Sequence, residues 1–327
     1  MGTAMKRAAF FALLMTLAAI YAAAAQSAAW PERPIHLIVP FPAGSSSDIV
    51  ARIVAQRLGE RLGQQLVVEN RPGASGNLGT EAVAHAAADG YTLGLANTST
   101  HTLSPSLMAN PAYDPVKDFA PISMLGASPF VLALYPGVPA KTVPELIALA
   151  KTRPAKLTFA SAGPATLANL AGVLFAKTAQ IELTPVSYRG SGQEILDVVA
   201  GRIDMAFATI PPTLPLIRDG KVRAIAVTGP QRSPALADVP TVAEAGLPGY
   251  ESVLWQALYA PAGTPAPIVT RLNAEVNAIL HDSAAVDALA KLGVEAQPST
   301  PQQFANRIAA DLKKWHDVIV SAGIQPQ

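Results

Sequence analysis

The chain has 327 residues, of which half are hydrophobic and 14% are charged, and its formal net charge is +1. This composition suits about two domains with large buried cores, and it argues against disorder and against a nucleic-acid binder, which would carry a basic surface. The sequence has no cysteine, which excludes disulfides, thiol catalysis and cysteine-based metal sites.

The first residues have the pattern of a targeting segment. Lys6 and Arg7 precede a long apolar run that ends in small residues. This pattern predicts a secretory signal peptide over residues 1–25, cut near Ala25 or Ala29. The alternative is a membrane anchor, because the run is nearly long enough to span a bilayer. The small residues and the polar segment that follows favour the signal peptide, so we expect a secreted protein that is soluble after cleavage.

Strand and helix patterns alternate in the first third of the mature chain. Apolar runs predict strands at 35–41, 65–70 and 91–97. Residues 48–63 and 77–87 have the spacing of amphipathic helices, and Gly63 is a stop signal for the first of them. The strand–helix–strand–helix–strand order predicts a parallel sheet with helices on both faces.

A second α/β unit follows, and the C-terminal third is expected to be helical. Strands are predicted at 130–135, 157–161, 183–188, 203–210 and 222–229, with helices between them. Helices are predicted at 265–282, 283–293 and 301–323. Two such units predict two lobes, with a ligand cleft that is lined by the loops after the strands.

The loop at 41–48 is the clearest of these strand-to-helix loops. It combines Gly44, three serines and Asp48 just before a helix, so its N–H groups could bind an anion. A capped helix without a ligand is an equal alternative for this loop alone, because Asp48 already compensates the positive helix end. Loops at 97–102, 161–166 and 188–194 repeat the small, polar composition.

Charged and catalytic candidates are few. Arg189 could grip a carboxylate with two hydrogen bonds, or it could be a surface residue. His101 is the one histidine expected near the cleft, and the histidines form no metal-binding or nucleophile-activating motif. The glycine spacing at 72–79 differs from the dinucleotide fingerprint and favours a tight turn. We therefore expect no catalytic residue, no metal and no cofactor.

Long segments of the chain resemble a known family. They include RPIHLIVPFPAGSSSD, VVENRPGASGNLG, YDPVKDFAPIS, LTFASAG, VSYRG, AGRIDMAF and RSPALADVPTVAEAGLPGYE. These segments are similar to the tripartite tricarboxylate transporter receptors, which are Bug-type periplasmic solute-binding proteins. The resemblance covers nearly all of the mature chain.

The resemblance implies a two-lobe type II periplasmic-binding-protein fold of the α/β class. Each lobe would be a mostly parallel sheet flanked by helices, with the ligand in the cleft between the lobes. Residues 30–126 and 250–327 would form lobe 1, and residues 127–249 would form lobe 2. The implied partners are a small organic carboxylate and membrane transporter subunits, and the protein is expected to be a monomer.

Carrying the family's ligand loops onto matching positions gives a predicted site. The predicted ligand-binding residues are Phe41, Ala43, Gly44, Ser45, Ser46, Asp48, Asn97, Thr98, Ser99, Ser161, Ala162, Gly163, Thr166, Asn169, Arg189, Gly190, Thr209 and Gln256.

The sequence departs from the family pattern at several of these positions. Ser45 replaces a common glycine, Asn169 a frequent histidine, and Gln256 an aromatic residue. Together with Ala208 and Thr209, these changes predict fewer charges around the distal part of the ligand, which favours a less polar or aromatic acid. Citrate as the tightest ligand would count against that hypothesis.

Two other functions remain as alternatives. One is a ligand-sensing receptor of the same fold that docks on a signalling protein. The other is a hydrolase that uses Ser46 or Ser161, although no general base is evident beside either serine.

Overall fold

The computed structural model describes residues 30–108, 112–161, 163–188, 191–321 and 324. The predicted signal peptide therefore lies outside the described residues. Among these residues, no helix is long and apolar enough to cross a membrane.

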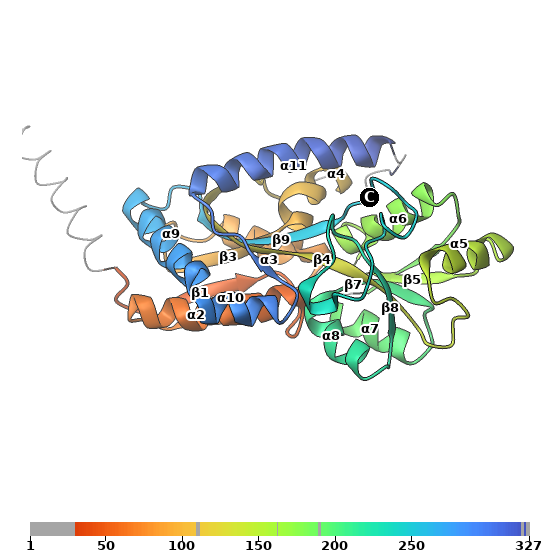
Figure 1. Cartoon of the computed structure of the whole chain (residues 1–327). Helices are drawn as coiled ribbons and strands as arrows, with labels where there is room; N and C mark the ends of the chain where they lie inside the picture. Colours follow the sequence, from red (N-terminus) through yellow and green to blue (C-terminus); the bar gives the residue numbers. More distant parts are fainter. Residues whose placement is uncertain (1–29, 109–111, 162, 189–190, 322–323, 325–327) are drawn as a thin grey trace, which may run out of the picture.

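Within the described residues, ten strands form one continuous, curled sheet flanked by helices (Figure 1). The strands are β1 (Ile35–Val39), β2 (Leu66–Asn70), β3 (Thr92–Asn97), β4 (Phe119–Leu134), β5 (Thr158–Ser161), β6 (Thr184–Ser187), β7 (Met205–Thr209), β8 (Arg223–Val227), β9 (Val253–Pro261) and β10 (Glu295–Ala296). The helices are α2 (Ser46–Leu62), α3 (Asn77–Ala84), α4 (Ser104–Leu107), α5 (Val143–Thr152), α6 (Leu167–Thr178), α7 (Ser191–Val199), α8 (Ile210–Arg218), α9 (Ala266–His281), α10 (Ser283–Ala290) and α11 (Pro301–Ser321). Short helical turns occur at η1 (Ala74–Gly76), η2 (Ser99–Leu103) and η3 (Pro234–Leu236).

The sheet has two parts that share β4. The strand order is β2-β1-β3-β9-β4-β7-β5-β6, with β10 and β8 also paired to β4. Strands β1, β2 and β3 are parallel, as are β5, β6 and β7, which confirms the parallel units predicted from the sequence. Strands β4 and β9 run antiparallel to their neighbours and join the two units.

Each part of the sheet is covered by its own helices and has its own core. We call the part around β1–β3 the first half and the part around β5–β8 the second half. Leu37, Val54 and Leu272 belong to the buried core that packs α2 and α9 on the first half. Phe159, Phe175 and Phe207 belong to the core that packs α6 on the second half. In Figure 1, α2, α9 and α10 lie with the first half on the left, and α5–α8 lie with the second half on the right.

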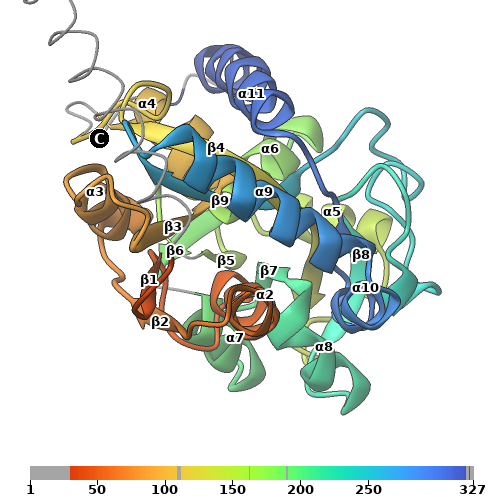
Figure 2. The same ribbon diagram turned by 90° about the vertical axis from the view of Figure 1, so that its left-hand side faces the viewer.

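Helix α11 contacts both halves. Phe304 and Ile308, near its start, pack on the first half, whereas Trp315 and Ile319 belong to the core of the second half. Figure 2 looks onto the first half and shows α9 across the front, between α11 above and α2 below. Strands β4 and β9 together with α11 therefore connect the halves.

Three strands differ from the sequence-based expectation. The strand predicted at 130–135 is the end of the 16-residue β4, and β9 and β10 lie where no element was predicted. Pro121 and Pro129 interrupt the strand pattern of β4 in the sequence, because proline is rare inside strands. The pairing of β4 with β9 shifts register next to Pro121.

Candidate ligand-binding cleft

A buried cavity of about 40 Å³ lies where loops from the two halves meet. The first half contributes the turn before α2, the end of β3 and η2, and the second half contributes the first turns of α6, α7 and α8. The lining residues are Phe41, Ser45, Ser46, Ser47, Asn97, Ser99, Phe130, Thr166, Ala168, Glu194, Thr209 and Leu254. Most of them come from segments that follow the carboxyl ends of strands, where an α/β sheet places its ligands, whereas Phe130 lies within β4 and Leu254 near the start of β9.

The turn before α2, which we call the serine turn (residues 44–47), is fixed by local sequence. Gly44 takes a left-handed φ of 79°, and Ser45 is the helix cap, whose hydroxyl accepts a hydrogen bond from Asp48 N at 3.3 Å. The first N–H groups of a helix have no partner within it. Ser46 and Ser47 occupy the first two helical positions, so their N–H groups are available to an anion at the positive end of the helix.

The hydroxyls of the serine turn are arranged as donors. Gln256 Nε2 donates to Ser46 Oγ at 3.0 Å, and Asn97 Nδ2 donates to Ser47 Oγ at 3.5 Å. Because each oxygen accepts from the protein, its own proton can be donated to a ligand. This wall of the cavity is therefore suited to an acceptor such as a carboxylate.

Asp48 stabilises the serine turn and does not line the cavity. Its carboxylate accepts hydrogen bonds from Gly44 N at 2.9 Å, Arg52 Nε at 3.0 Å and Asn70 Nδ2 at 2.8 Å. Burial alone would raise the pKa of Asp48, but the hydrogen bonds from Arg52, Gly44 and Asn70 outweigh it and hold the pKa below its usual value. The charge of Asp48 is thus compensated within the protein, away from the cavity.

The second half presents further helix N-termini to the same cavity. Thr166 caps α6 by accepting from Asn169 N at 3.4 Å, and its hydroxyl donates to Gly163 O at 2.6 Å. Leu167 N, the first N–H of α6, donates to Ser99 Oγ at 3.0 Å. This last bond joins the two halves directly.

Glu194 is the charged residue among the lining residues that the sequence analysis did not predict. It lies in the first turn of α7 with a relative exposure of 0%, and neither carboxyl oxygen has a partner among the described residues. Burial raises the pKa of Glu194 to about 8. The one sequence signal that could have found it is an acidic residue in the first helical turn after the carboxyl end of a strand.

Seven of the predicted site residues line the cavity and the others do not. The seven are Phe41, Ser45, Ser46, Asn97, Ser99, Thr166 and Thr209. The lining residues that were not predicted are Ser47, Phe130, Ala168, Glu194 and Leu254.

The remaining predicted residues have other positions. Ala43 and Gly44 are exposed, Thr98 Oγ1 accepts from Trp255 N at 3.1 Å, and Ser161 Oγ donates to Asn169 Oδ1 at 3.3 Å. Gly163 lies against Ser75 of the first half, and Gln256 lies behind Ser46. Ala162, Arg189 and Gly190 lie outside the described residues.

His101 does not line this cavity. It is fully buried, packs on Phe119 and Tyr259 with ring centroids 5.0 and 4.7 Å away, and faces a separate small hollow. Burial lowers the pKa of His101 to about 3, so its ring is neutral. No group of three or more His, Asp or Glu side chains that could hold a metal ion occurs in the described part of the chain.

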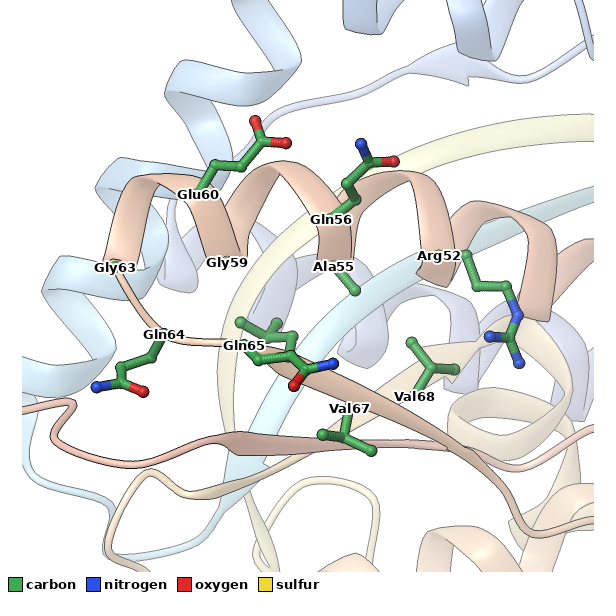
Figure 3. Close-up of a pocket in the computed structure, with 11 residues that line it drawn as sticks. Arg52, Ala55, Gln56, Gly59, Glu60, Gly63, Gln64, Gln65, Val67 and Val68 are labelled. Atoms are coloured by element: carbon green, nitrogen blue, oxygen red, sulfur yellow. The ribbon is translucent and has the colours of Figure 1, made fainter.

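A larger but open groove of about 750 Å³ lies on the surface between α2 and β2 (Figure 3). In Figure 3, Gln56 and Glu60 extend from α2 on the side away from β2, and Arg52 extends toward the side where Val68 lies. Ligand sites are usually enclosed, with polar groups that converge. The buried cavity, although smaller, fits that description better than the groove.

Comparison with known proteins places this architecture in a family. Residues 50–324 match the model of the tripartite tricarboxylate transporter family receptor. The solved structure of R. palustris Rpa4515 with adipate is 36% identical, with a TM-score of 0.89 over 91% of this chain and 100% of that protein. The structure of periplasmic binding protein BugD is 32% identical, with a TM-score of 0.86 over 91% of this chain and 100% of BugD.

A third structure has a different acid. MatC (Rpa3494) from Rhodopseudomonas palustris with bound malate is 34% identical, with a TM-score of 0.84 over 89% of this chain and 100% of MatC. The two-lobe α/β fold expected from the sequence is thereby confirmed. The chain belongs to the tripartite tricarboxylate transporter receptor family of Bug-type periplasmic solute-binding proteins.

Proposed function

We propose that this protein is a periplasmic receptor that captures a small organic carboxylate between its two halves and delivers it to a tripartite tricarboxylate-type membrane transporter. The observation that carries the proposal is the serine turn, whose N–H groups and hydroxyl donors face a buried cavity between the halves. Helix N-termini favour anions at such a position. The relatives described with adipate and malate support a carboxylate as that anion.

Ligand entry requires the halves to separate. A cavity of about 40 Å³ holds little more than a water molecule, whereas a dicarboxylate is several times larger. In the proposed cycle an open form admits the acid, and the bond between Leu167 N and Ser99 Oγ is remade or replaced on closure. A ligand drives closure only by binding the closed form more tightly than the open form.

The lobe boundaries and the predicted site belong to the same proposal. Residues 30–126 and 250–327 are proposed as lobe 1 and residues 127–249 as lobe 2. The separate cores on the two sides of β4 support this division. Export through a cleaved signal peptide is supported by the apolar N-terminal segment and by the description of BugD as periplasmic.

Binding without chemical conversion is also proposed. The described residues that line the cavity with Ser46 and Ser47 include no histidine. Ser161, which does not line the cavity, donates its hydroxyl proton to Asn169. A serine nucleophile needs a general base within hydrogen-bond reach. The hydrolase alternative therefore lacks its second component in the described part of the site.

The proposal is tested by thermal shift and calorimetry with acids and their matched amides. An acid present at about 100 times its dissociation constant should stabilise the protein by roughly 2.7 kcal/mol, and the amide should not. Replacing both Ser46 and Ser47 by alanine removes two donors to a charged group and should weaken acid binding about a hundredfold.

The matched control is Ser283→Ala, an exposed serine at the start of α10, which is capped by Asp282. This variant should bind acids as the wild type does. Equal binding of an acid and its amide, or an unchanged affinity in the double variant, would refute the proposed anchor.

A further inference from the structure

The carboxyl group of Glu194 is the one titratable side chain among the described residues that line the cavity. Both of its oxygens are buried without a partner in the described part of the structure. Charged residues are rarely buried unless they are paired, because desolvation without compensating hydrogen bonds is costly. An unpartnered carboxyl on a residue that lines this cavity therefore indicates a group that the ligand brings.

The charged neighbours of Glu194 are already paired with each other. The Tyr188 hydroxyl donates to Asp197 Oδ2 at 2.7 Å, and Asp197 pairs with Arg202 at 2.8 Å. Strands β5 and β7 and the first turn of α8, which pack around α7, carry no charged residue. Across the cavity, Asp48 is bonded to Arg52. Within the described residues, no cation is left to compensate Glu194.

The two walls of the cavity therefore make opposite demands on a ligand. The serine turn offers N–H and O–H donors, whereas Glu194 offers two acceptor oxygens when it is ionised. Thr209 Oγ1, which is also buried without a partner, adds a hydroxyl that can accept or donate on the same side. A ligand that satisfies both walls must accept hydrogen bonds at one group and donate them at another.

A second carboxylate is a poor match for this second wall. It would place like charges together unless Glu194 kept its proton, and a glutamine could donate to it without the cost of a buried ionisable group. What a carboxyl adds over an amide is the ability to become negative. That property is useful toward a cation.

We propose that the ligand is a carboxylic acid that also carries a protonated amino group, and that Glu194 binds this ammonium while the serine turn binds the carboxylate. The inference rests on the proposed carboxylate-receptor function and adds the class of substrate. Phe130 and Leu254 supply apolar lining to the same cavity, which suits the hydrocarbon part of an amino acid.

Binding of such a ligand should release a proton. In the ligand-free protein Glu194 is mostly protonated at pH 7, because burial raises its pKa to about 8. The ammonium group stabilises the ionised carboxylate, so the bound form loses that proton. A ligand with a second carboxylate would leave Glu194 protonated and release none.

The test is calorimetric titration of the purified protein with two matched series of acids. One series is alanine, lactate and propanoate, and the other is 4-aminobutanoate, 4-hydroxybutanoate, butanoate and succinate. Each titration is repeated at pH 7 in two buffers of different ionisation enthalpy, which gives the number of protons released. The same set is applied to Glu194→Gln and to Glu182→Gln, an exposed control.

We expect an amino acid of one series to bind at least tenfold more tightly than its hydroxy counterpart, with release of about one proton. Glu194→Gln should abolish both the preference and the proton release, and Glu182→Gln should retain both. Tight binding of succinate or the hydroxy acids, with no proton released and no effect of Glu194→Gln, would overturn this inference and leave the carboxylate receptor standing. Failure of every acid in both series, together with no effect of any acid in the thermal-shift test, would overturn both.

Discussion

The two walls of the cavity use similar residues in opposite ways. In the first half, the hydroxyls of Ser45, Ser46 and Ser47 all accept hydrogen bonds from protein donors, and the nearby carboxylate of Asp48 has three partners. In the second half, Glu194 and Thr209 are buried without partners. In the proposed function the first wall is a preorganised anion site, whereas the second wall keeps buried polar groups without partners, which destabilise the ligand-free protein. Unsatisfied groups of this kind are typical of sites where stability is lower because a ligand completes the structure.

The largest expected effect is on the pH dependence of the free energy of unfolding, and it arises from Glu194 in the second wall. The folded-state pKa of Glu194 is about 8, above its ordinary value of 4.5. The folded protein therefore holds a proton that the unfolded chain loses, and the free energy of unfolding should fall as the pH rises from about 4.5 to 8. Glu194→Gln removes this loss. The free energy of unfolding of the variant, relative to that of the wild type, should therefore increase by a few kcal/mol as the pH rises across that range.

Urea unfolding of ligand-free protein at several pH values between 5 and 8 measures this difference. Glu182→Gln should remain parallel to the wild type. Parallel curves for Glu194→Gln and the wild type would show that Glu194 is not desolvated, and the contrast between the walls would disappear.

The second prediction concerns Asp48, which stabilises the serine turn of the first wall. Asp48→Asn removes a carboxylate that organises the serine turn, and it should lower the free energy of unfolding at pH 7 by about 2 kcal/mol, since Arg52 is half exposed and its attraction is screened. The folded pKa of Asp48 lies below 3.8, so its contribution is present above that pH and is lost as the pH falls below it.

Unfolding at pH 7 and at pH 3 checks the sign of this effect. The difference between Asp48→Asn and the wild type should shrink at the lower pH. Asp219→Asn, which removes a surface pair with Lys221, is the control and should change little at either pH. A difference for Asp48→Asn that is unchanged at pH 3 would contradict the assigned role of the charge.

The smallest prediction compares two threonines that cap helices of the second half. Thr166 makes a capping hydrogen bond and donates to Gly163 O, whereas the Thr209 hydroxyl makes none. Thr166→Val should therefore cost about 1 kcal/mol of stability, and Thr209→Val should be neutral or slightly stabilising. Thermal unfolding of both variants without ligand measures the contrast, and an equal loss in the two would show that Thr209 has a partner.

The sequence predicted the first wall better than the second, for a physical reason. A glycine that permits a left-handed turn, a serine cap and an acidic first turn are local signals, so Gly44, Ser45 and Asp48 could be interpreted without a structure. The polar loops at 97–102 and 161–166, which contain Asn97 and Thr166, were also visible in the sequence, and the resemblance to a receptor family added Thr209. The placement of these three residues around one cavity depends on segments that are distant in sequence. Asp48 shows the limit of this reasoning, because its partners turn it away from the cavity.

Tertiary pairing and burial account for what the sequence did not predict. Strand β9 forms between β3 and β4, and only those distant partners make residues 253–261 a strand. Glu194 is polar and follows a glycine-containing loop, so it has the composition of a solvent-exposed first helical turn. Its burial depends on β5, β7 and α8, which pack against α7 and lie outside its local sequence pattern.

A crystal structure of the protein with the acid that gives the largest thermal shift tests the central claim most directly. The proposed function predicts the carboxylate of that acid within hydrogen-bond distance of the N–H groups and hydroxyls of Ser46 and Ser47, in the cavity between the halves. A carboxylate bound in the open groove between α2 and β2, with the cavity between the halves unchanged, would contradict it.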